Sequence, residues 1–146
     1  AIQLGAAMLA KAEPKTNEDR TFQLLGLQWS GSDKDVIRKA ARALLSEQRS
    51  NGGWAQLRSL DPDAYATGQA LVALKETGTL AVTDPAYQSG IQFLLNSQLE
   101  DGSWYVKTRS IAIQPYFDSD FPHGRDQFIS AAATNWATMA LAPAAR

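Results

Sequence analysis

Cysteine is absent from the 146 residues, which excludes disulfide bonds, a thiolate zinc site and a cysteine nucleophile. An excess of one charge is also absent, because 14 Lys and Arg side chains stand against 15 Asp and Glu, for a net charge of −1. A basic footprint for nucleic acid or an anionic membrane is therefore lacking, and we expect no nucleic-acid partner. A cysteine-free domain suits either side of a membrane, so the composition assigns no cellular compartment.

Long hydrophobic runs are missing as well. The longest apolar stretch, near 131–142, is interrupted by Thr134, Asn135 and Thr138, so we expect no transmembrane segment. Hydrophobic residues make up 45% of the chain and charged residues 20%, which is typical of a folded globular protein. The length suits one domain, 1–146. The chain begins at Ala1 without a signal-peptide pattern, and we interpret it as an excised part of a longer protein.

The sequence does contain an internal repeat. Residues 44–54 align with residues 94–104 at an offset of 104 − 54 = 50, and both segments contain Leu-Leu followed by Gln-x-x-x-Gly-x-Trp. An alanine-rich segment follows each copy, at 65–74 and at 132–141, and these two align at an offset of 132 − 65 = 67. The second copy therefore carries 67 − 50 = 17 extra residues between its Trp and its alanine-rich segment.

Hydrophobic periodicity predicts an all-α chain, because apolar side chains recur at the spacing of one helix face. Ser32-x-x-Asp35 resembles a capping box at the start of the third helix, and Gly78 is a stop signal after the fourth. Residues 105–124 are predicted to form a long loop with a short extended stretch at 110–114. The expected elements are about six helices in three pairs, at 1–12, 21–29, 32–49 and 64–77, from Asp84-Pro85 onward, and at 126–141.

Each Gln-x-x-x-Gly-x-Trp element lies where a helix is expected to end. A Gln side chain can bond the free backbone groups of a helix end, a Gly permits a left-handed turn, and a Trp is large enough to cover the junction with the next helix. This chemistry favours a structural role over contact with a ligand. The residues concerned are Gln48, Gly52, Trp54, Gln98, Gly102 and Trp104.

The segment Lys39-Ala40-x-x-x-Leu44-x-x-x-Gln48-x-x-x-Gly52-x-Trp54 resembles the QW motif of squalene/oxidosqualene cyclases and related terpenoid cyclases. The second copy, 90–104, is similar but follows Ser89, where the family favours Lys or Arg. The resemblance covers residues 33–141 and implies an (α/α) toroid with alanine-rich inner helices around an apolar cavity. Three helix pairs would make only a partial toroid. A weaker resemblance extends to protein prenyltransferase β subunits, complement thioester domains and some pectate lyases.

The cyclase resemblance implies a test for catalysis, because class II cyclases protonate their substrate with an Asp in an Asp-x-Asp-Asp or Asp-Cys-Thr-Ala context. Such an acid must be kept protonated by burial and by a neighbouring carboxylate. The sequence Asp118-Ser119-Asp120-Phe121 lacks the fourth residue of that motif. The prenyltransferase zinc site and the thioester both require a Cys, which this chain lacks. Asp118-x-Asp120 does not begin an EF-hand loop either, because the loop glycine would have to stand one position before Gly124. We therefore expect no metal and no cofactor.

The 105–126 segment still offers a candidate site, since long loops in compact domains are often functional. Asp118 and Asp120 are the candidate catalytic acids, and His123 is the candidate base or ligand. Alternatively, the segment is a solvated connection whose aromatic side chains cover the core. In that case Asp126 stabilises the first turn of the last helix through the helix dipole. The candidate ligand-binding residues are Tyr105, Arg109, Tyr116, Phe117 and Arg125, with the two arginines suited to a diphosphate or a carboxylate.

Two functional hypotheses remain open. The first is a non-catalytic repeat domain whose concave face binds an apolar molecule, such as an isoprenoid, or a protein partner, either a second copy or the missing part of the parent chain. The second is part of a terpenoid cyclase whose other half is absent. A polysaccharide lyase-like toroid is a third, less favoured hypothesis, suggested only by residues 51–56.

Overall fold

The computed structural model describes residues 1–111, 113 and 115–145. Within these residues the chain is all-α, as the periodicity predicts, and contains no strand. Two short 3-10 helices, η1 (Gly124–Asp126) and η2 (Ala142–Ala145), flank the last α-helix. The α-helices are α1 (Ile2–Lys11), α2 (Asn17–Trp29), α3 (Lys34–Leu45), α4 (Ala64–Glu76), α5 (Pro85–Ser97) and α6 (Gln127–Leu141).

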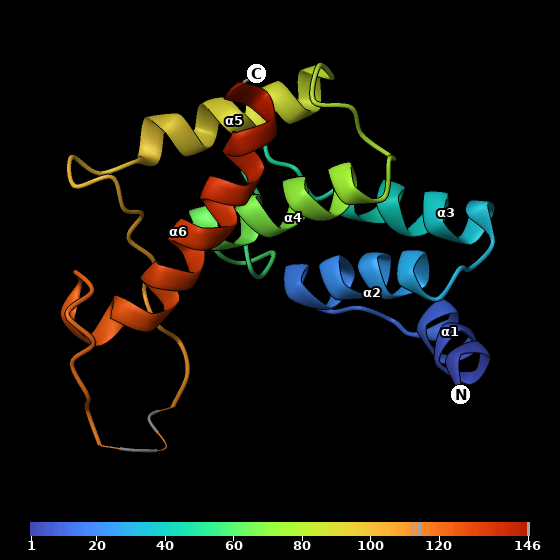
Figure 1. Cartoon of the computed structure of the whole chain (residues 1–146), viewed down its shortest axis with the longest axis horizontal. Helices are drawn as coiled ribbons and strands as arrows, with labels where there is room; N and C mark the ends of the chain where they lie inside the picture. Colours follow the sequence, from blue (N-terminus) through green and yellow to red (C-terminus); the bar gives the residue numbers. More distant parts are fainter. Residues whose placement is uncertain (112, 114, 146) are drawn as a thin grey trace.

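The helices form two layers (Figure 1). Helices α2, α4 and α6 follow one another side by side, while α3 packs on α2 and α4, and α5 packs on α4 and α6. Helix α4 is central and is almost entirely buried from Ala64 to Leu74. This arrangement of three successive helix pairs is a partial helical toroid, which confirms the predicted fold class.

Small residues explain how closely the inner helices approach. A Cβ atom added to Gly68 of α4 would lie 2.6 Å from the backbone carbonyl carbon of Trp136 in α6. The alanines that face this crossing, Ala133, Ala137 and Ala140, are fully buried. The alanine-rich stripes of the sequence therefore lie where α4 and α6 pack closely in the core.

The helix ends differ from the predicted ones in three places. Helix α2 begins at Asn17, four residues early, because Thr16 and Asp19 form a reciprocal capping box. Helix α3 is capped by Asp33 rather than by Ser32, since the Asp33 side chain accepts the Asp35 N–H at 2.7 Å. Helix α3 also ends at residue 45 rather than at residue 49, so Gln48 lies in the turn that follows it.

The segment from Tyr105 to His123 carries neither helix nor strand in its described residues, in agreement with the predicted loop. Part of the predicted extended stretch, residues 112 and 114, lies outside the described residues. Within the described part of the chain, no helix has both the length and the apolar character needed to cross a membrane.

Candidate functional site

Both repeat elements build the same closed turn. The indole N–H of Trp54 donates to the Leu44 carbonyl at 2.9 Å, and that of Trp104 donates to the Leu94 carbonyl at 2.8 Å. Both rings are buried, with 0% and 2% of their residue surface exposed. Each Trp thus satisfies a carbonyl in the last turn of the preceding helix while it fills the junction with the next.

The Gln and Gly positions complete these turns. Gln48 Nε2 donates to the Gly52 carbonyl, and Gln98 Nε2 donates to the Gly102 carbonyl, each at 2.9 Å. Gly52 and Gly102 have φ angles of +88° and +82°, a left-handed conformation that other residues rarely adopt. In the first copy Asn51 Oδ1 also accepts the Gly53 N–H at 3.2 Å, so residues of the 51–56 segment stabilise this turn.

Each Trp is also tied to the following inner helix. The Trp54 N–H donates to Thr67 Oγ1 at 2.9 Å, and the Trp104 N–H donates to Thr134 Oγ1 at 3.1 Å. The repeat therefore keeps its contact with the inner helix in both copies. The longer link of the second copy stays bonded to the start of α6 through Val106 and Thr108, whose N–H groups donate to Ser130 Oγ at 3.0 Å and to Asp126 Oδ1 at 2.8 Å. Beyond Thr108 it extends away from the helices and returns at α6 (Figure 1).

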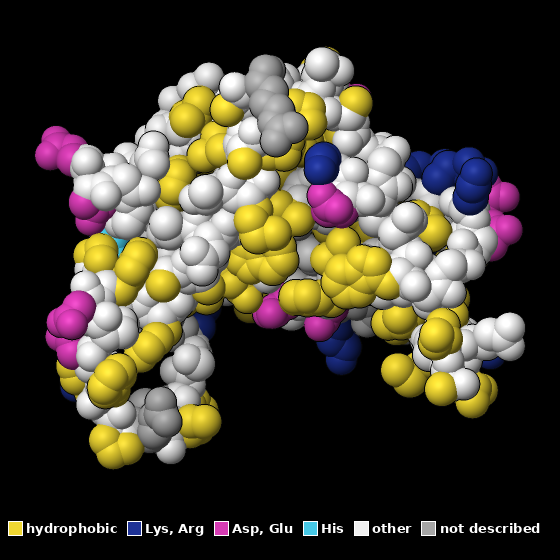
Figure 2. Space-filling view, viewed as in Figure 1, with side chains coloured by type: hydrophobic (Ala, Val, Ile, Leu, Met, Phe, Trp, Pro, Cys, Tyr) yellow, Lys and Arg dark blue, Asp and Glu magenta, His cyan; other side chains and the backbone are white. Residues whose placement is uncertain are grey.

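A cavity of about 650 Å³ opens between this link and the inner helices, within the size range of small-molecule sites. Figure 2 shows the molecule hollowed between the link and α1, with hydrophobic side chains around the hollow. Much of the cavity wall is apolar and aromatic. The lining residues are Glu18, Gln56, Tyr65, Lys107, Thr108, Arg109, Ser110, Ile111, Ile113, Pro115, Tyr116, Phe117, Arg125, Phe128, Ile129 and Ala132.

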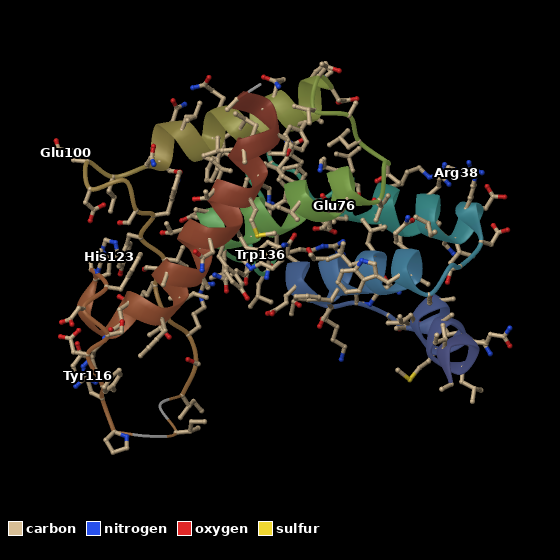
Figure 3. The ribbon with its side chains drawn as sticks, viewed as in Figure 1. Arg38, Glu76, Glu100, Tyr116, His123 and Trp136 are labelled. Atoms are coloured by element: carbon tan, nitrogen blue, oxygen red, sulfur yellow. The ribbon has the colours of Figure 1, made fainter. Side chains whose placement is uncertain are left out.

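The inner helices contribute two contacts on this side of the molecule. The Tyr65 hydroxyl donates to Glu18 Oε1 at 3.2 Å, and burial, followed by the nearby Glu18 carboxylate, raises the pKa of Tyr65. Phe22 of α2 meets Trp136 of α6 edge to face, with ring centroids 6.4 Å apart. Figure 3 shows Trp136 where α6 passes α4 and α2.

Four of the predicted ligand-binding residues, Arg109, Tyr116, Phe117 and Arg125, line the cavity. Tyr105 does not. Its hydroxyl instead donates to Asp126 Oδ2 at 2.9 Å.

The three predicted catalytic residues lie outside the cavity lining. Asp118 and Asp120 are exposed, and Asp118 Oδ1 accepts the Asp120 N–H at 3.0 Å. His123 is half-buried, shares a 2.8 Å hydrogen bond between its Nε2 and Ser103 Oγ, and packs edge to face on Tyr105. In Figure 3 His123 lies near the base of the loop and Tyr116 farther out. The structure therefore separates these three residues from the apolar cavity.

The comparison with protein families finds a match to the squalene-hopene cyclase C-terminal domain over residues 16–146. The chain belongs to this family. No curated protein and no solved structure matches it significantly. The match extends the resemblance of the QW motifs to α2, whose residues precede both motifs.

One residue of this cyclase-family domain that the sequence did not single out is Gln127, which holds the loop in place. It is fully buried at the start of α6, and its Oε1 accepts the Ser119 N–H at 2.5 Å and the Ser119 hydroxyl. Its Nε2 donates to the Phe117 carbonyl at 3.0 Å and to the Tyr116 hydroxyl at 3.2 Å. A buried amide that uses both ends in this way fixes the aromatic wall of the cavity.

A second missed residue is Asp63, which caps α4. Its carboxylate accepts the Ala66 N–H at 2.8 Å and the Gln56 Nε2–H at 2.7 Å. Burial raises the pKa of Asp63 and outweighs these hydrogen bonds, which lower it. A signal was present, because Asp61-Pro62-Asp63 has the same Asp-x-Asp spacing as Asp118 and Asp120 and directly precedes an alanine-rich helix.

Among the residues that the structure describes, no group of three or more His, Asp or Glu side chains is arranged to hold a metal ion. The chemistry that the cavity offers is an apolar surface with a few polar and cationic groups at its edge.

Proposed function

We propose that this chain is a single, non-catalytic domain of the squalene-hopene cyclase family that binds an apolar small molecule on its concave side. The observation that carries the proposal is the cavity of about 650 Å³, whose wall includes Ile111, Phe117, Phe128 and Ile129. Burial of an apolar chain against such a wall contributes about 25 cal/mol per Å² of apolar surface removed from water. A molecule with an isoprenoid-like chain fits this description.

The position of the acids supports a non-catalytic role. An acid that protonates an alkene must be buried so that it stays protonated and touches the substrate. Asp118 and Asp120 are exposed and lie outside the cavity lining, and Asp120 donates its backbone N–H to Asp118 rather than facing an apolar wall. We propose that these residues shape the loop.

The experiment is a titration of the chain with farnesol, a neutral isoprenoid alcohol, followed by calorimetry. Ala132 lines the cavity, so Ala132→Phe should fill part of it and weaken binding at least about tenfold. Ala43→Phe, on the exposed side of α3, is the matched control and should bind as the wild type does. Absence of farnesol binding by the wild type, or equal binding by Ala132→Phe, would overturn the proposal.

A terpenoid cyclase fragment is the second candidate, and Asp63 is the observation that favours it. Its carboxyl has a pKa raised by burial, and its partner Gln56 lines the cavity. Incubation of the chain with squalene, followed by mass spectrometry, tests this alternative. We expect no cyclised product, whereas a product that disappears in Asp63→Asn would establish the enzyme.

A protein partner is the remaining expectation, and α1 supports it. Ile2, Leu4 and Met8 of this helix are exposed, and exposed apolar side chains in a group favour association. Light scattering across a range of concentrations detects self-association. A substituted variant, Ile2→Ser/Leu4→Ser/Met8→Ser, should remain monomeric if α1 mediates it.

A further inference from the structure

Three cationic side chains line the otherwise largely apolar cavity: Lys107, Arg109 and Arg125. All three are exposed, and none of them forms a hydrogen bond or an ion pair within 4 Å with a described residue. Arg20, Arg38 and Arg58, by contrast, each pair with a carboxylate. The N–H donors at the edge of the cavity are therefore available to a ligand.

A fixed piece of backbone brings these cations together. Asp126 accepts the Thr108 N–H at 2.8 Å and the Tyr105 hydroxyl at 2.9 Å. These two bonds attach the start of the loop, which carries Lys107 and Arg109, to η1, which carries Arg125. The Thr108 N–H is also the first cause of the lowered pKa of Asp126. Lys107 and Arg109 thus form one rim of the cavity with Arg125, which lies far from them in sequence.

Nearby acids limit the positive charge of this rim. Burial raises the pKa of Asp63, and the charge of Arg109 partly opposes this rise. The Thr108 N–H is the first cause of the lowered pKa of Asp126, to which the charge of Lys107 adds. Each of these two cations therefore has an acid in its vicinity. Glu18 also lines the cavity, where the Tyr65 hydroxyl donates to it. Both carboxylate oxygens of Asp63 and of Asp126 accept hydrogen bonds, and Glu18 accepts one on Oε1. The three cationic side chains have no such bond to a described residue. The site therefore offers strong donors with little net charge, which suits a head group with one negative charge better than a multiply charged diphosphate.

We infer that the cavity binds a single-chain amphiphile with a carboxylate head, its chain against Ile111, Phe117 and Phe128 and its head on Arg109 and Arg125. The inference rests on the proposed function, since it specifies the ligand of the same cavity. An arginine binds a carboxylate through two parallel hydrogen bonds, a stronger interaction than one with a neutral hydroxyl. A neutral ligand would leave these donors without a charged acceptor.

Calorimetric titration of the full chain with sodium oleate, below its micelle concentration, tests the inference against oleyl alcohol, which has the same chain. We expect oleate to bind at least about tenfold more tightly, because hydrogen bonds to charged groups contribute more than neutral ones. Raising the salt concentration should weaken oleate binding and leave oleyl alcohol binding unchanged. Farnesyl diphosphate should bind more weakly than oleate.

Arg109→Gln/Arg125→Gln should lose about tenfold in oleate affinity and keep its affinity for oleyl alcohol. Lys11→Gln/Lys39→Gln is the control, because it removes two charges outside the cavity lining and should bind oleate normally. Equal binding of acid and alcohol by the wild type, or tighter binding of farnesyl diphosphate, would overturn the carboxylate assignment while leaving the apolar site intact. Binding of neither acid nor alcohol would instead overturn the proposed function itself.

Discussion

The two QW elements have the same internal bonds but different neighbours. In the first copy, Gln48 Nε2 donates both to Gly52 and to the Ala86 carbonyl at 2.8 Å, in the first turn of α5. In the second copy, Gln98 donates to Gly102, and within the described residues it has no such second bond. Gln48 is half-buried, whereas Gln98 is exposed. Through Gln48 the first element therefore also bonds α5, whereas Gln98 of the second element closes only its own turn.

The glycines show the same contrast. A Cβ atom on Gly52 would lie 2.3 Å from the Ser89 carbonyl oxygen in α5, whereas the nearest atom to one on Gly102 is Gln98 Nε2 at 4.0 Å. The motif therefore encodes the turn, and the adjacent helix determines how tightly the turn is packed. A motif read from sequence predicts the first of these properties and not the second.

Substitution of either motif tryptophan should have the largest effect on stability, and the effect should be the same in both copies. Trp54→Ala and Trp104→Ala should each lower the free energy of unfolding by about 3–5 kcal/mol, because both indoles are buried and bonded alike. Urea denaturation followed by circular dichroism measures both. A small effect in either variant would mean that this copy does not form part of the core.

Substitution of the motif glycines should destabilise the two copies by different amounts. Gly102→Ala should cost about 1–2 kcal/mol for a left-handed alanine. Gly52→Ala should cost about 1–3 kcal/mol more, because the methyl group also meets the Ser89 backbone. Comparison of the two denaturation midpoints checks the order, and equal values would show that α5 shifts to admit the methyl group.

The glutamines should show a smaller difference in the same direction. Gln48→Ala removes two hydrogen bonds at a half-buried position and should cost about 1–3 kcal/mol. Gln98→Ala removes one exposed bond and should cost less than about 0.5 kcal/mol. A loss of stability in Gln98→Ala as large as that in Gln48→Ala would contradict the proposed difference between the two glutamines.

The smallest effect concerns the acids that precede the two inner helices. Because the folded pKa of Asp63 is raised above its ordinary value of 3.8, this residue destabilises the fold as pH rises through the window above 3.8. The pKa of Asp126 is lowered, so its contribution is present above 3.8 and is lost as pH falls through its lowered pKa. Asp63→Asn, which keeps a capping side chain, and Asp126→Asn should therefore change the pH dependence of unfolding, measured from pH 3 to 7, in opposite directions. Changes in the same direction would refute this assignment.

Most of the fold was predictable from the sequence because helix periodicity and the repeat both report local chemistry. The start of α2 was also encoded, in Thr16-x-x-Asp19, but lies four residues before the apolar pattern begins. The end of α3 was predicted too late, because the Gln of the motif continues the helical spacing although it serves the turn. Element types were thus more predictable than element ends.

The candidate site was predictable only in part. The loop and its arginines were identified because the second copy is longer than the first. Tyr65 and Ala132, which align in the repeat, both line the cavity, but the sequence does not show which face of an inner helix meets the loop. Gln127 was not identified because a buried amide that supports a loop resembles any polar residue at a helix start. Such contacts depend on how distant segments meet in space.

The four tryptophans give the domain separate spectroscopic reporters. Trp54 and Trp104 are buried in the repeat turns, so their fluorescence should emit at short wavelength and shift to the red only when the fold opens. Trp29 is 74% exposed and should emit as an indole in water in every state. Trp136 lies one helical turn beyond Ala132 of the cavity and against Phe22. In a Trp29→Phe background, a ligand should therefore change the emission of Trp136 alone, so that occupancy and unfolding can be followed as two distinct optical signals.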